Sequence, residues 1–420
     1  MRRWVAFSLL LVCMRAEALD CSRPAGSLPD SSVPAGTANA AVPIEHIVVI
    51  MQENRSFDTY FGSLNVTGYE GQIDGIRPNM SNRARRGDNV RVYHAKNLCT
   101  PDINHSWNAM HALSNGGRND QFVINNGKTS MQYYDKTDLP YYYGLANQFA
   151  VADRFFASAM TQTYPNRLFL YAASSFGHIR NDESPSYSEF KQKTIFDVLD
   201  ANHITWKYYQ TEEDYLKLFA PLHARDQRKI AKADQFRVDV AAKKLPQVAF
   251  VESSERGKQD EHPPSNIQIG QTWVADKIDA LLASDYWANS VLFLVYDENG
   301  GYYDHVPSPE ACLPDGVAPA LGPGNAPGGF DHYGFRVPFI AISPYAKHHF
   351  VSHVTYDHTS ILKFIETKYN LPALTRRDAN ADGLMDMFDF SHQEVKVLKL
   401  PSSKMDPKRA LFCRRHPNGA

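Results

Sequence analysis

Short apolar runs rich in β-branched and aromatic residues alternate along this chain with stretches of helical periodicity. The apolar runs predict strands at residues 44–51, 203–209, 247–251, 290–296 and 337–343. The amphipathic stretches predict helices at residues 194–201, 271–284 and 358–369. Strands that are apolar throughout are typical of a sheet covered on both faces, and their alternation with helices favours parallel pairing. The pattern therefore predicts an α/β protein with a mostly parallel central sheet.

The N-terminal residues have the pattern of a secretory signal peptide. Arg2 and Arg3 precede an apolar run at residues 4–14, and the small-x-small sequence at residues 16–18 is typical of a cleavage site. The apolar run is shorter than the ~20 residues needed to span a bilayer, and no later stretch is long and apolar enough. We therefore expect a signal peptide at residues 1–18 and a secreted protein, either extracellular or periplasmic.

Composition divides the remaining chain into a short leader and one large domain. Residues 19–42 are rich in Ala, Ser, Pro and Gly and predict a flexible leader, whereas residues 43–420 predict a single catalytic domain. Within that domain, the polar stretch at residues 64–150 predicts an insertion that would cover a functional site. The formal net charge of −2 gives no electrostatic basis for binding nucleic acid, so we expect no nucleic-acid partner.

Four cysteines follow the predicted signal peptide: Cys21, Cys99, Cys312 and Cys413. An even number of cysteines in an exported protein predicts two disulfides, and three pairings of the four residues are open.

Polar clusters follow two of the predicted strands directly. Glu53 and Asn54 come after residues 44–51, and Asp297 and Glu298 come after residues 290–296. Ligands of parallel sheets bind beyond the carboxyl ends of the strands, and carboxylate and amide oxygens are suitable ligands for a divalent cation. The alternative is that the clusters are only a polar strand-to-helix turn and an acidic Gly-Gly turn.

A third cluster combines a hydroxyl group with a predicted helix start. Pro165 suits the first turn of a helix, so Thr163 is expected just ahead of the N-terminus, where N–H groups and the helix dipole attract an anion. Asn166 and Arg167 would be within reach of a phosphoryl group bound there. Threonine is a weak nucleophile unless a metal or base lowers its pKa. The alternative is an ordinary helix cap.

Several histidines lie beside acidic residues and are candidates for protonating a leaving alkoxide. They are His105, His262, His305 and His358. Histidine supplies a proton donor in the neutral pH range, although a single histidine is more often a surface or core residue.

Together these motifs resemble a known family. The segments ENRSFDTYFG, TYPNR, DEHPP, DENGGYYDHV and DHTSILKFIE begin at Glu53, Thr163, Asp260, Asp297 and Asp357. In this order they are similar to the phosphoesterase family of bacteria, fungi and plants, over about residues 44–390. That family contains phospholipases C, some preferring phosphocholine lipids, and certain acid phosphatases.

The resemblance implies a three-layer α/β/α sandwich of the alkaline-phosphatase-like superfamily. It also implies one divalent metal cation, of unspecified identity, held by Glu53, Asn54, Asp297 and Glu298. Thr163 would be the metal-activated nucleophile and would form a phospho-threonine intermediate. The remaining implied residues bind phosphate oxygens or protonate the leaving group; they are His105, His262, and His305 or His358, with Asn166 beside the nucleophile.

We therefore expect a secreted, metal-dependent phosphoric-ester hydrolase of the phospholipase C type. An acid phosphatase on the same site is the close alternative, and a non-catalytic exported binding protein is the remote one. The expected partner is a phosphate-ester substrate, a phospholipid in the first case, with at most transient contact with a membrane surface. A lipid substrate requires an exposed apolar rim near the site, for which the tyrosines at residues 141–143 are candidates.

Overall fold

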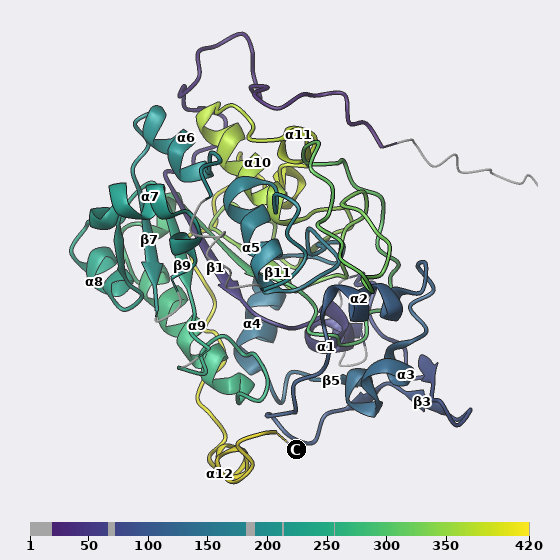
Figure 1. Ribbon diagram of the computed structural model, residues 1–420. Coiled ribbons are helices and arrows are strands. Elements are labelled where there is room, and N and C mark those ends of the chain that lie inside the picture. The colour runs from purple at the N-terminus through teal and green to yellow at the C-terminus, as the bar shows by residue number, and fades with distance from the viewer. Residues whose placement is uncertain (1–18, 66–71, 182–189, 212–213, 256, 420) are drawn as a thin grey trace, which may run out of the picture.

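A computed structural model describes residues 19–65, 72–181, 190–211, 214–255 and 257–419 (Figure 1). The predicted signal peptide at residues 1–18 lies outside the described residues. Within them, the main sheet has eight strands in the order β12-β6-β11-β10-β1-β9-β7-β8. Its strands are β1 (His46–Gln52), β6 (Ala150–Ala152), β7 (Trp206–Gln210), β8 (Ile230–Lys232), β9 (Val248–Glu252), β10 (Ser290–Tyr296), β11 (Phe339–Ile342) and β12 (Phe350–Ser352).

Most neighbouring strands of this sheet are parallel, as predicted. Only β11 runs against its neighbours β10 and β6. All residues of β10 are buried, and all residues of β1 after His46 are buried as well. The two strands pair in register from His46 opposite Ser290 to Gln52 opposite Tyr296. Because of this register, Glu53 and Asp297 are equivalent positions just beyond the carboxyl ends of adjacent strands.

Two groups of helices form the outer layers of an α/β/α sandwich (Figure 1). In one group α5 (Thr163–Ala172) contacts α6 (Ile195–Ala201) and α10 (His358–Tyr369). In the other, α9 (Ile267–Leu282) contacts α4 (Pro140–Gln148) and α8 (Gln235–Ala241). The predicted fold class is therefore confirmed.

The other elements are short. The helices are α1 (Phe57–Tyr60), α2 (Trp107–Ser114), α3 (Phe122–Asn126), α7 (Ala220–Arg225), α11 (Arg376–Ala379) and α12 (Pro407–Arg415). The strands outside the main sheet are β2 (Ser81–Arg83), β3 (Asn89–Arg91), β4 (Tyr93–His94) and β5 (Gln132–Tyr133). Turns of 3-10 helix lie at Gly62–Asn65, Lys128–Met131, Tyr215–Leu218, Gln227–Lys229, Trp287–Asn289 and Met385–Met387.

The elements differ from the sequence prediction at their ends. Strand β7 begins at Trp206 rather than at residue 203, because the chain turns at His203, where φ is 59°. Helix α9 begins before residue 271, because the side chain of Asn266 accepts a hydrogen bond from the Gln268 N–H and caps the helix there. Helix α10 and strand β10 have the predicted bounds.

The segment at residues 19–42, for which a flexible leader is predicted, is attached to the domain at several points. Cys21 forms a disulfide with Cys312. Backbone hydrogen bonds join Gly26 to Ala373 and Asn39 to residue 368, at 2.8 and 2.7 Å. The backbone is irregular, as its composition suggests, but these contacts hold it against the end of α10.

The second disulfide joins Cys99 to Cys413, so the structure settles which of the three pairings is present. It ties the loop ahead of α2 to the C-terminal helix α12. The predicted insertion at residues 64–150 is only partly separate from the sandwich, because its last helix, α4, contacts α9. No helix among the described residues has the length and apolar character needed to cross a membrane.

Candidate active site

The two predicted acidic clusters meet at the carboxyl ends of β1 and β10. The Asn54 backbone has φ of 69°, which turns the chain sharply after the strand. Its N–H donates to Asp297 Oδ1 at 3.0 Å, and its side-chain Nδ2 donates to Glu298 Oε1 at 3.1 Å. Asn54 therefore links the end of β1 to both acidic residues that follow β10.

A glycine holds the second cluster in place. The Gly300 N–H donates to Glu298 Oε2 at 2.7 Å, and Gly300 has φ of 65°. A Cβ atom at this position would lie 2.2 Å from Asn54 Oδ1, far closer than two such atoms approach. The predicted Gly-Gly turn therefore has a specific physical requirement at its first residue.

The electrostatics of this cluster favour a bound cation. Asp297 and Glu298 are fully buried. Burial raises the pKa of both carboxyls well above their usual range, and the nearby Glu53 carboxylate raises both further. Asn54 Oδ1 and Asp297 Oδ2 are buried without a hydrogen-bond partner among the described residues. Buried acids and unsatisfied oxygens of this kind are suited to a hard divalent cation, so the residues fit the metal that the sequence predicts.

Thr163 is the first residue of α5 and only 2% exposed. It was expected just ahead of the helix and lies one position further, with Gln162 as the N-cap. Its hydroxyl donates to Glu53 Oε1 at 3.1 Å. The nucleophile predicted from one motif is therefore in contact with an acid from another.

Asn166 holds the turn that presents Thr163. Its Oδ1 accepts from the Ala159 N–H at 2.9 Å, and its Nδ2 donates to the carbonyls of Thr161 and Gln162, both at 3.0 Å. Because these backbone contacts engage the side-chain amide, Asn166 is placed to position Thr163 rather than to bind a phosphoryl group as predicted.

Arg167 follows Thr163 by about one turn of α5 and links two carboxylates. Its guanidinium donates to Glu53 Oε2 at 3.2 Å and to Glu252, while its Nε lies 3.9 Å from Asp297 Oδ2. Arg167 is fully buried, and the ring of Tyr215 stacks 4.2 Å from it. Arg167 is thus the cation that partly balances the acidic cluster.

Glu252 was not identified from the sequence. It is the last residue of β9, the strand beside β1, and it accepts hydrogen bonds from Arg167 and the Tyr171 hydroxyl. Burial raises its pKa, and these two donors act against that rise. An acid at the carboxyl end of a predicted buried strand was the signal that could have identified it.

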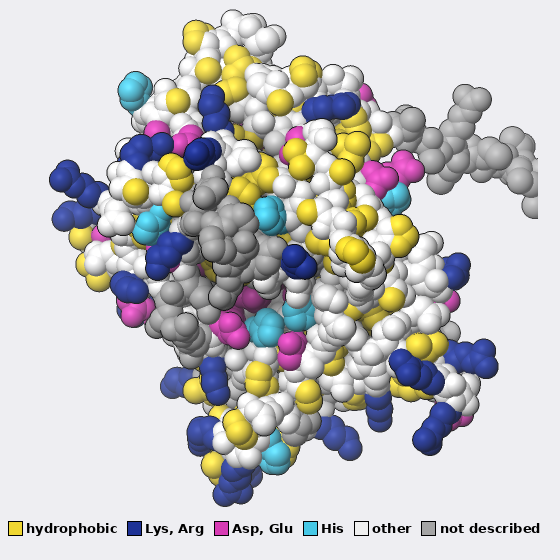
Figure 2. Space-filling view, viewed as in Figure 1, with side chains coloured by type: hydrophobic (Ala, Val, Ile, Leu, Met, Phe, Trp, Pro, Cys, Tyr) yellow, Lys and Arg dark blue, Asp and Glu magenta, His cyan; other side chains and the backbone are white. Residues whose placement is uncertain are grey.

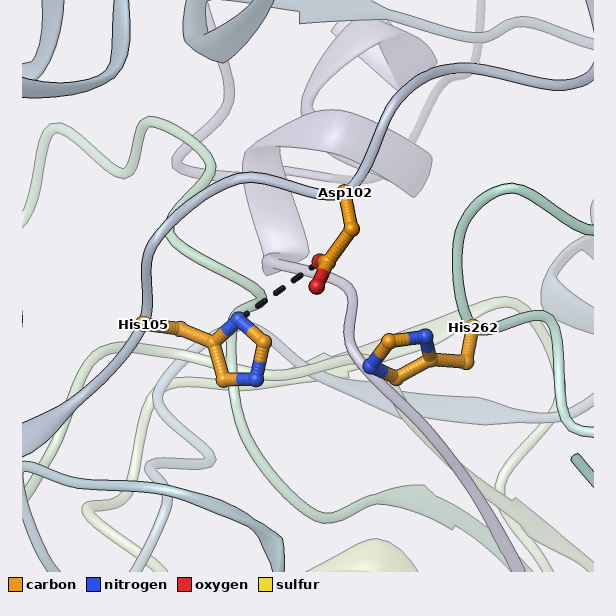
Figure 3. Close-up of side chains that lie close together, drawn as sticks. All are labelled: Asp102, His105 and His262. Carbon is orange, nitrogen blue, oxygen red and sulfur yellow. Dashed lines mark ion pairs between the residues drawn. The ribbon is translucent and has the colours of Figure 1, made fainter. Parts of the chain in front are cut away.

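Asp102, His105 and His262 form a second group next to the acidic cluster. Figure 3 shows their side chains pointing toward one another, with His262 on a different loop from the other two. Each offers a ligand atom within 4.8 Å of the others, so this group too is a candidate for binding a cation. Asn54 connects the groups, since its Nδ2 lies 3.4 Å from His105 Nε2. Asp102 was not among the residues singled out from the sequence.

The backbone orients both imidazoles in the same way. His105 Nδ1 donates to the carbonyl of Ile103 at 2.8 Å, and His262 Nδ1 donates to the carbonyl of Pro263 at 2.6 Å. His262 therefore keeps its Nε2 atom for a proton or a ligand, whereas His105 Nε2 faces the side-chain amide of Asn54 at 3.4 Å.

The loop that carries His262 is anchored by its neighbour Glu261. The buried carboxylate of Glu261 accepts hydrogen bonds from the hydroxyls of Tyr60, Tyr142 and Tyr296 at 2.6, 2.5 and 2.7 Å. Tyr142 and its neighbours Tyr141 and Tyr143 are all buried, so residues 141–143 do not form the exposed apolar rim that was expected.

His305 is not brought to this site. Its Nδ1 lies 2.7 Å from Asp58 and its Nε2 lies 3.0 Å from Asp74, so carboxylates occupy both nitrogens. Burial alone would lower its pKa, but these carboxylates raise it to about 9. Arg336 completes the group through Asp58. His305 therefore belongs to an ionic cluster with Asp58, Asp74 and Arg336, and its contacts give no support to its predicted role in binding phosphate.

His358 is also occupied. It is fully buried at the start of α10, with Nε2 2.9 Å from the Tyr296 carbonyl and Nδ1 3.0 Å from the Ser158 hydroxyl. Burial lowers its pKa to about 4, so it is neutral. It links α10 to the end of β10 and has no nitrogen left for substrate.

Comparison with known proteins gives consistent results. A sequence model of the phosphoesterase family matches residues 44–372. Non-specific phospholipase C1 of Arabidopsis thaliana is 32% identical, over 86% of this chain and 74% of that protein. Phospholipase C B of Mycobacterium tuberculosis is 30% identical, over 83% of this chain and 78% of that protein. Non-hemolytic phospholipase C of Burkholderia pseudomallei is 29% identical, over 92% of this chain and 65% of that protein.

Solved structures with similar arrangements are far more distant. One is the lipoteichoic acid synthase LtaP of Listeria monocytogenes, with a TM-score of 0.40 and 12% identity over 86% of this chain and 80% of that one. Another is a protein in the alkaline phosphatase superfamily from Vibrio parahaemolyticus, with a TM-score of 0.41 and 11% identity over 86% of this chain and 71% of that one.

Proposed function

This chain belongs to the phosphoesterase family and is a hydrolase of phosphoric esters, and from that premise we propose that it is a secreted, metal-dependent enzyme of the phospholipase C type. The observation that carries the proposal is the contact between the Thr163 hydroxyl and Glu53 at the edge of a buried acidic cluster. A hydroxyl at a helix N-terminus beside a cation site is the arrangement expected for a nucleophile that attacks phosphorus.

Glu53, Asn54, Asp297 and Glu298 would hold a divalent cation. When bound, that cation would lower the pKa of the Thr163 hydroxyl and neutralise charge on the phosphate. Once deprotonated, the three carboxylates would repel an anionic phosphoryl group, so the charge of the cation would be needed to compensate them. Arg167 remains engaged with Glu53 and Glu252 and supplies part of the balance.

The proposed reaction has two steps at phosphorus. First, Thr163 Oγ1 attacks, its proton passes to the Glu53 oxygen that it already contacts, and the P–O bond to the alcohol breaks. His105 or His262, protonated at Nε2, gives its proton to the departing alkoxide. Water then attacks phosphorus, the same imidazole takes a proton from the water, and the P–O bond to Thr163 Oγ1 breaks. The phosphorylated head group is released, and Thr163 Oγ1 recovers its own proton from Glu53.

The substrate proposed is a phospholipid, cleaved to diacylglycerol and a phosphorylated head group. Support comes from the relatives, which are named phospholipases C and come from a plant and from bacteria. Export is supported by the predicted signal peptide and by the two disulfides, since disulfides persist in oxidising compartments.

Steady-state hydrolysis of p-nitrophenyl phosphorylcholine and p-nitrophenyl phosphate by the purified protein tests this proposal. We expect faster turnover of the choline diester, loss of activity with a chelator, and recovery on adding divalent cation. Thr163→Ala should lose activity by at least roughly 10³-fold. Thr205→Ala is the matched control, because Thr205 is exposed and precedes β7 at the opposite edge of the sheet. Preference for the monoester would instead indicate a phosphatase, and full activity of Thr163→Ala would refute the mechanism.

A further inference from the structure

A surface loop between β10 and β11 exposes apolar side chains. Leu313, Val317 and Leu321 have exposed fractions of 49%, 49% and 42%, and they rank among the most exposed large hydrophobic side chains of the described residues. We call residues 313–321 the apolar loop. Isolated exposed leucines need no explanation, but several within one short segment mark a surface that meets another apolar phase.

The apolar loop has almost no charge. Between residues 311 and 330 the sequence contains a single charged side chain, Asp315, in a chain with 21% charged residues. Asp315 is also engaged, since it accepts hydrogen bonds from the Ser174 hydroxyl and from the Val317 N–H. Figure 2 shows the area over these loops mainly in yellow and white, with histidine and acidic side chains gathered lower on the same face.

The loop is held in place rather than free. Cys312, just before it, is joined to Cys21. The Ala320 N–H donates to the Gly177 carbonyl at 2.8 Å, and after the loop the Trp107 indole donates to the Ala326 carbonyl at 2.8 Å. Because these contacts fix the loop already, binding a partner costs little further ordering of the backbone.

Short contacts connect the apolar loop to the turn that presents Thr163. Gly177, whose carbonyl accepts from the Ala320 N–H, lies in the loop that follows α5, and residues 179–181 belong to the same loop. The Thr161 hydroxyl donates to the carbonyl of residue 179, and the Tyr164 N–H donates to the side chain of residue 181 at 2.8 Å. The loop that follows α5 therefore contacts both the apolar loop and the buried turn at the start of α5, so a single loop separates the two.

We propose that the apolar loop rests on the surface of a lipid bilayer and so places the Thr163 site against phospholipid head groups. The inference rests on the proposed function, because a phospholipid substrate is itself part of a lipid surface. The contact is shallow, because the irregular loop has backbone N–H and C=O groups that must stay hydrated. The loop itself contributes apolar area and no cation, since no Lys or Arg occurs between residues 311 and 330. The exposed Arg376 borders it, because the Arg376 N–H donates to the Pro314 carbonyl at 3.0 Å.

Co-sedimentation with phosphatidylcholine vesicles tests the contact without requiring catalysis. The test variant combines Leu313→Ser, Val317→Ser and Leu321→Ser. The control variant makes the same change at Val238, Leu398 and Leu411, which have exposed fractions of 55%, 66% and 41% elsewhere. We expect the test variant to bind vesicles at least ~10-fold more weakly than the wild type, and the control to bind within ~2-fold of it. Binding by the wild type should change little between about 0.1 M and 1 M salt.

A gain-of-binding variant covers the case in which the triple variant folds poorly. Leu321→Trp adds an amphipathic side chain that favours the membrane interface. We expect it to bind vesicles more tightly than the wild type, and we expect its additional fluorescence to shift to the blue when vesicles are added. Fluorescence that is unchanged, with binding equal to the wild type, would contradict the proposal.

Hydrolysis separates failure of this inference from failure of the proposed function. The test variant should keep its activity on p-nitrophenyl phosphorylcholine within ~2-fold while losing at least ~10-fold on phosphatidylcholine vesicles. A wild type that binds vesicles through the loop but hydrolyses no diester would refute the function and leave the contact standing. A wild type that hydrolyses the soluble diester, while the test variant binds vesicles equally well, would overturn the contact alone. Self-association through the loop, with no vesicle binding, would also overturn it.

Discussion

Replacing Arg167 with methionine should cost the protein much of its stability when no divalent cation is bound. Arg167 is fully buried and donates charge-assisted hydrogen bonds to Glu53 and Glu252, which lie at the ends of neighbouring strands. Methionine fills similar space but leaves both carboxylates buried without their cation. Breaking a buried pair by removing one partner costs ~3–5 kcal/mol, because the remaining charge is uncompensated. We expect a loss in that range.

The expected loss can be measured by urea unfolding in the presence of a chelator, as a lower midpoint with an unchanged slope. Arg167→Lys should recover only part of the stability, because a single ammonium group cannot reach two carboxylates as the guanidinium does. Adding Glu252→Gln to Arg167→Met should lessen the cost, since it removes one of the unpaired charges. A loss below about 1 kcal/mol for Arg167→Met would show that the carboxylates are neutral or hydrated, and the electrostatic reasoning would then be wrong.

Three further predictions concern other parts of the site. Gly300→Ala would place a methyl group 2.2 Å from the Asn54 side-chain oxygen at a positive φ, so it should lose roughly 2–4 kcal/mol in thermal unfolding and bind divalent cation more weakly in calorimetry. Its two carboxylates raise the pKa of His305 to about 9, so the stabilisation from its charge is fully present below about pH 6.5 and is lost as the pH rises to about 9. The free energy of unfolding of the wild type should therefore fall by roughly 2–3 kcal/mol across that window. His305→Gln should lack this dependence on pH. Glu261→Gln, which cannot accept from all three tyrosine hydroxyls, should loosen the loop of His262, lowering kcat with little change in KM, and an unchanged kcat would contradict this positioning role.

The predictable parts of the fold are the long buried elements. Strand β10 and helix α10 show their periodicity over enough residues to be recognised, and both have the predicted bounds. Strands β6 and β12 have three residues each, too few to show any period, so they depend on pairing with the rest of the sheet. The direction of β11 also escapes sequence reasoning, because an apolar run has the same appearance in either orientation.

The site divides in the same way. Glu53 and Asp297 can be expected to meet, because parallel strands bring their carboxyl ends to one edge of a sheet. The position of His305 cannot be anticipated, since its partner Asp74 lies far away in the chain and approaches only in the folded protein. Glu252 was overlooked although it follows a predicted strand, because a single acid after a strand matches no motif. Its contact with Arg167 is visible only in three dimensions.

The central claim is that Thr163 carries the phosphoryl group during turnover. Acid quenching of the enzyme during hydrolysis of p-nitrophenyl phosphorylcholine, followed by proteolysis and mass spectrometry, tests it directly. The account predicts that the peptide containing Thr163 gains the mass of the transferred phosphoryl portion of the substrate, and that the same peptide from the Thr163→Ser variant is also modified. If the enzyme turns over normally before the quench and the added mass is found on another residue, the assignment of Thr163 as nucleophile is contradicted.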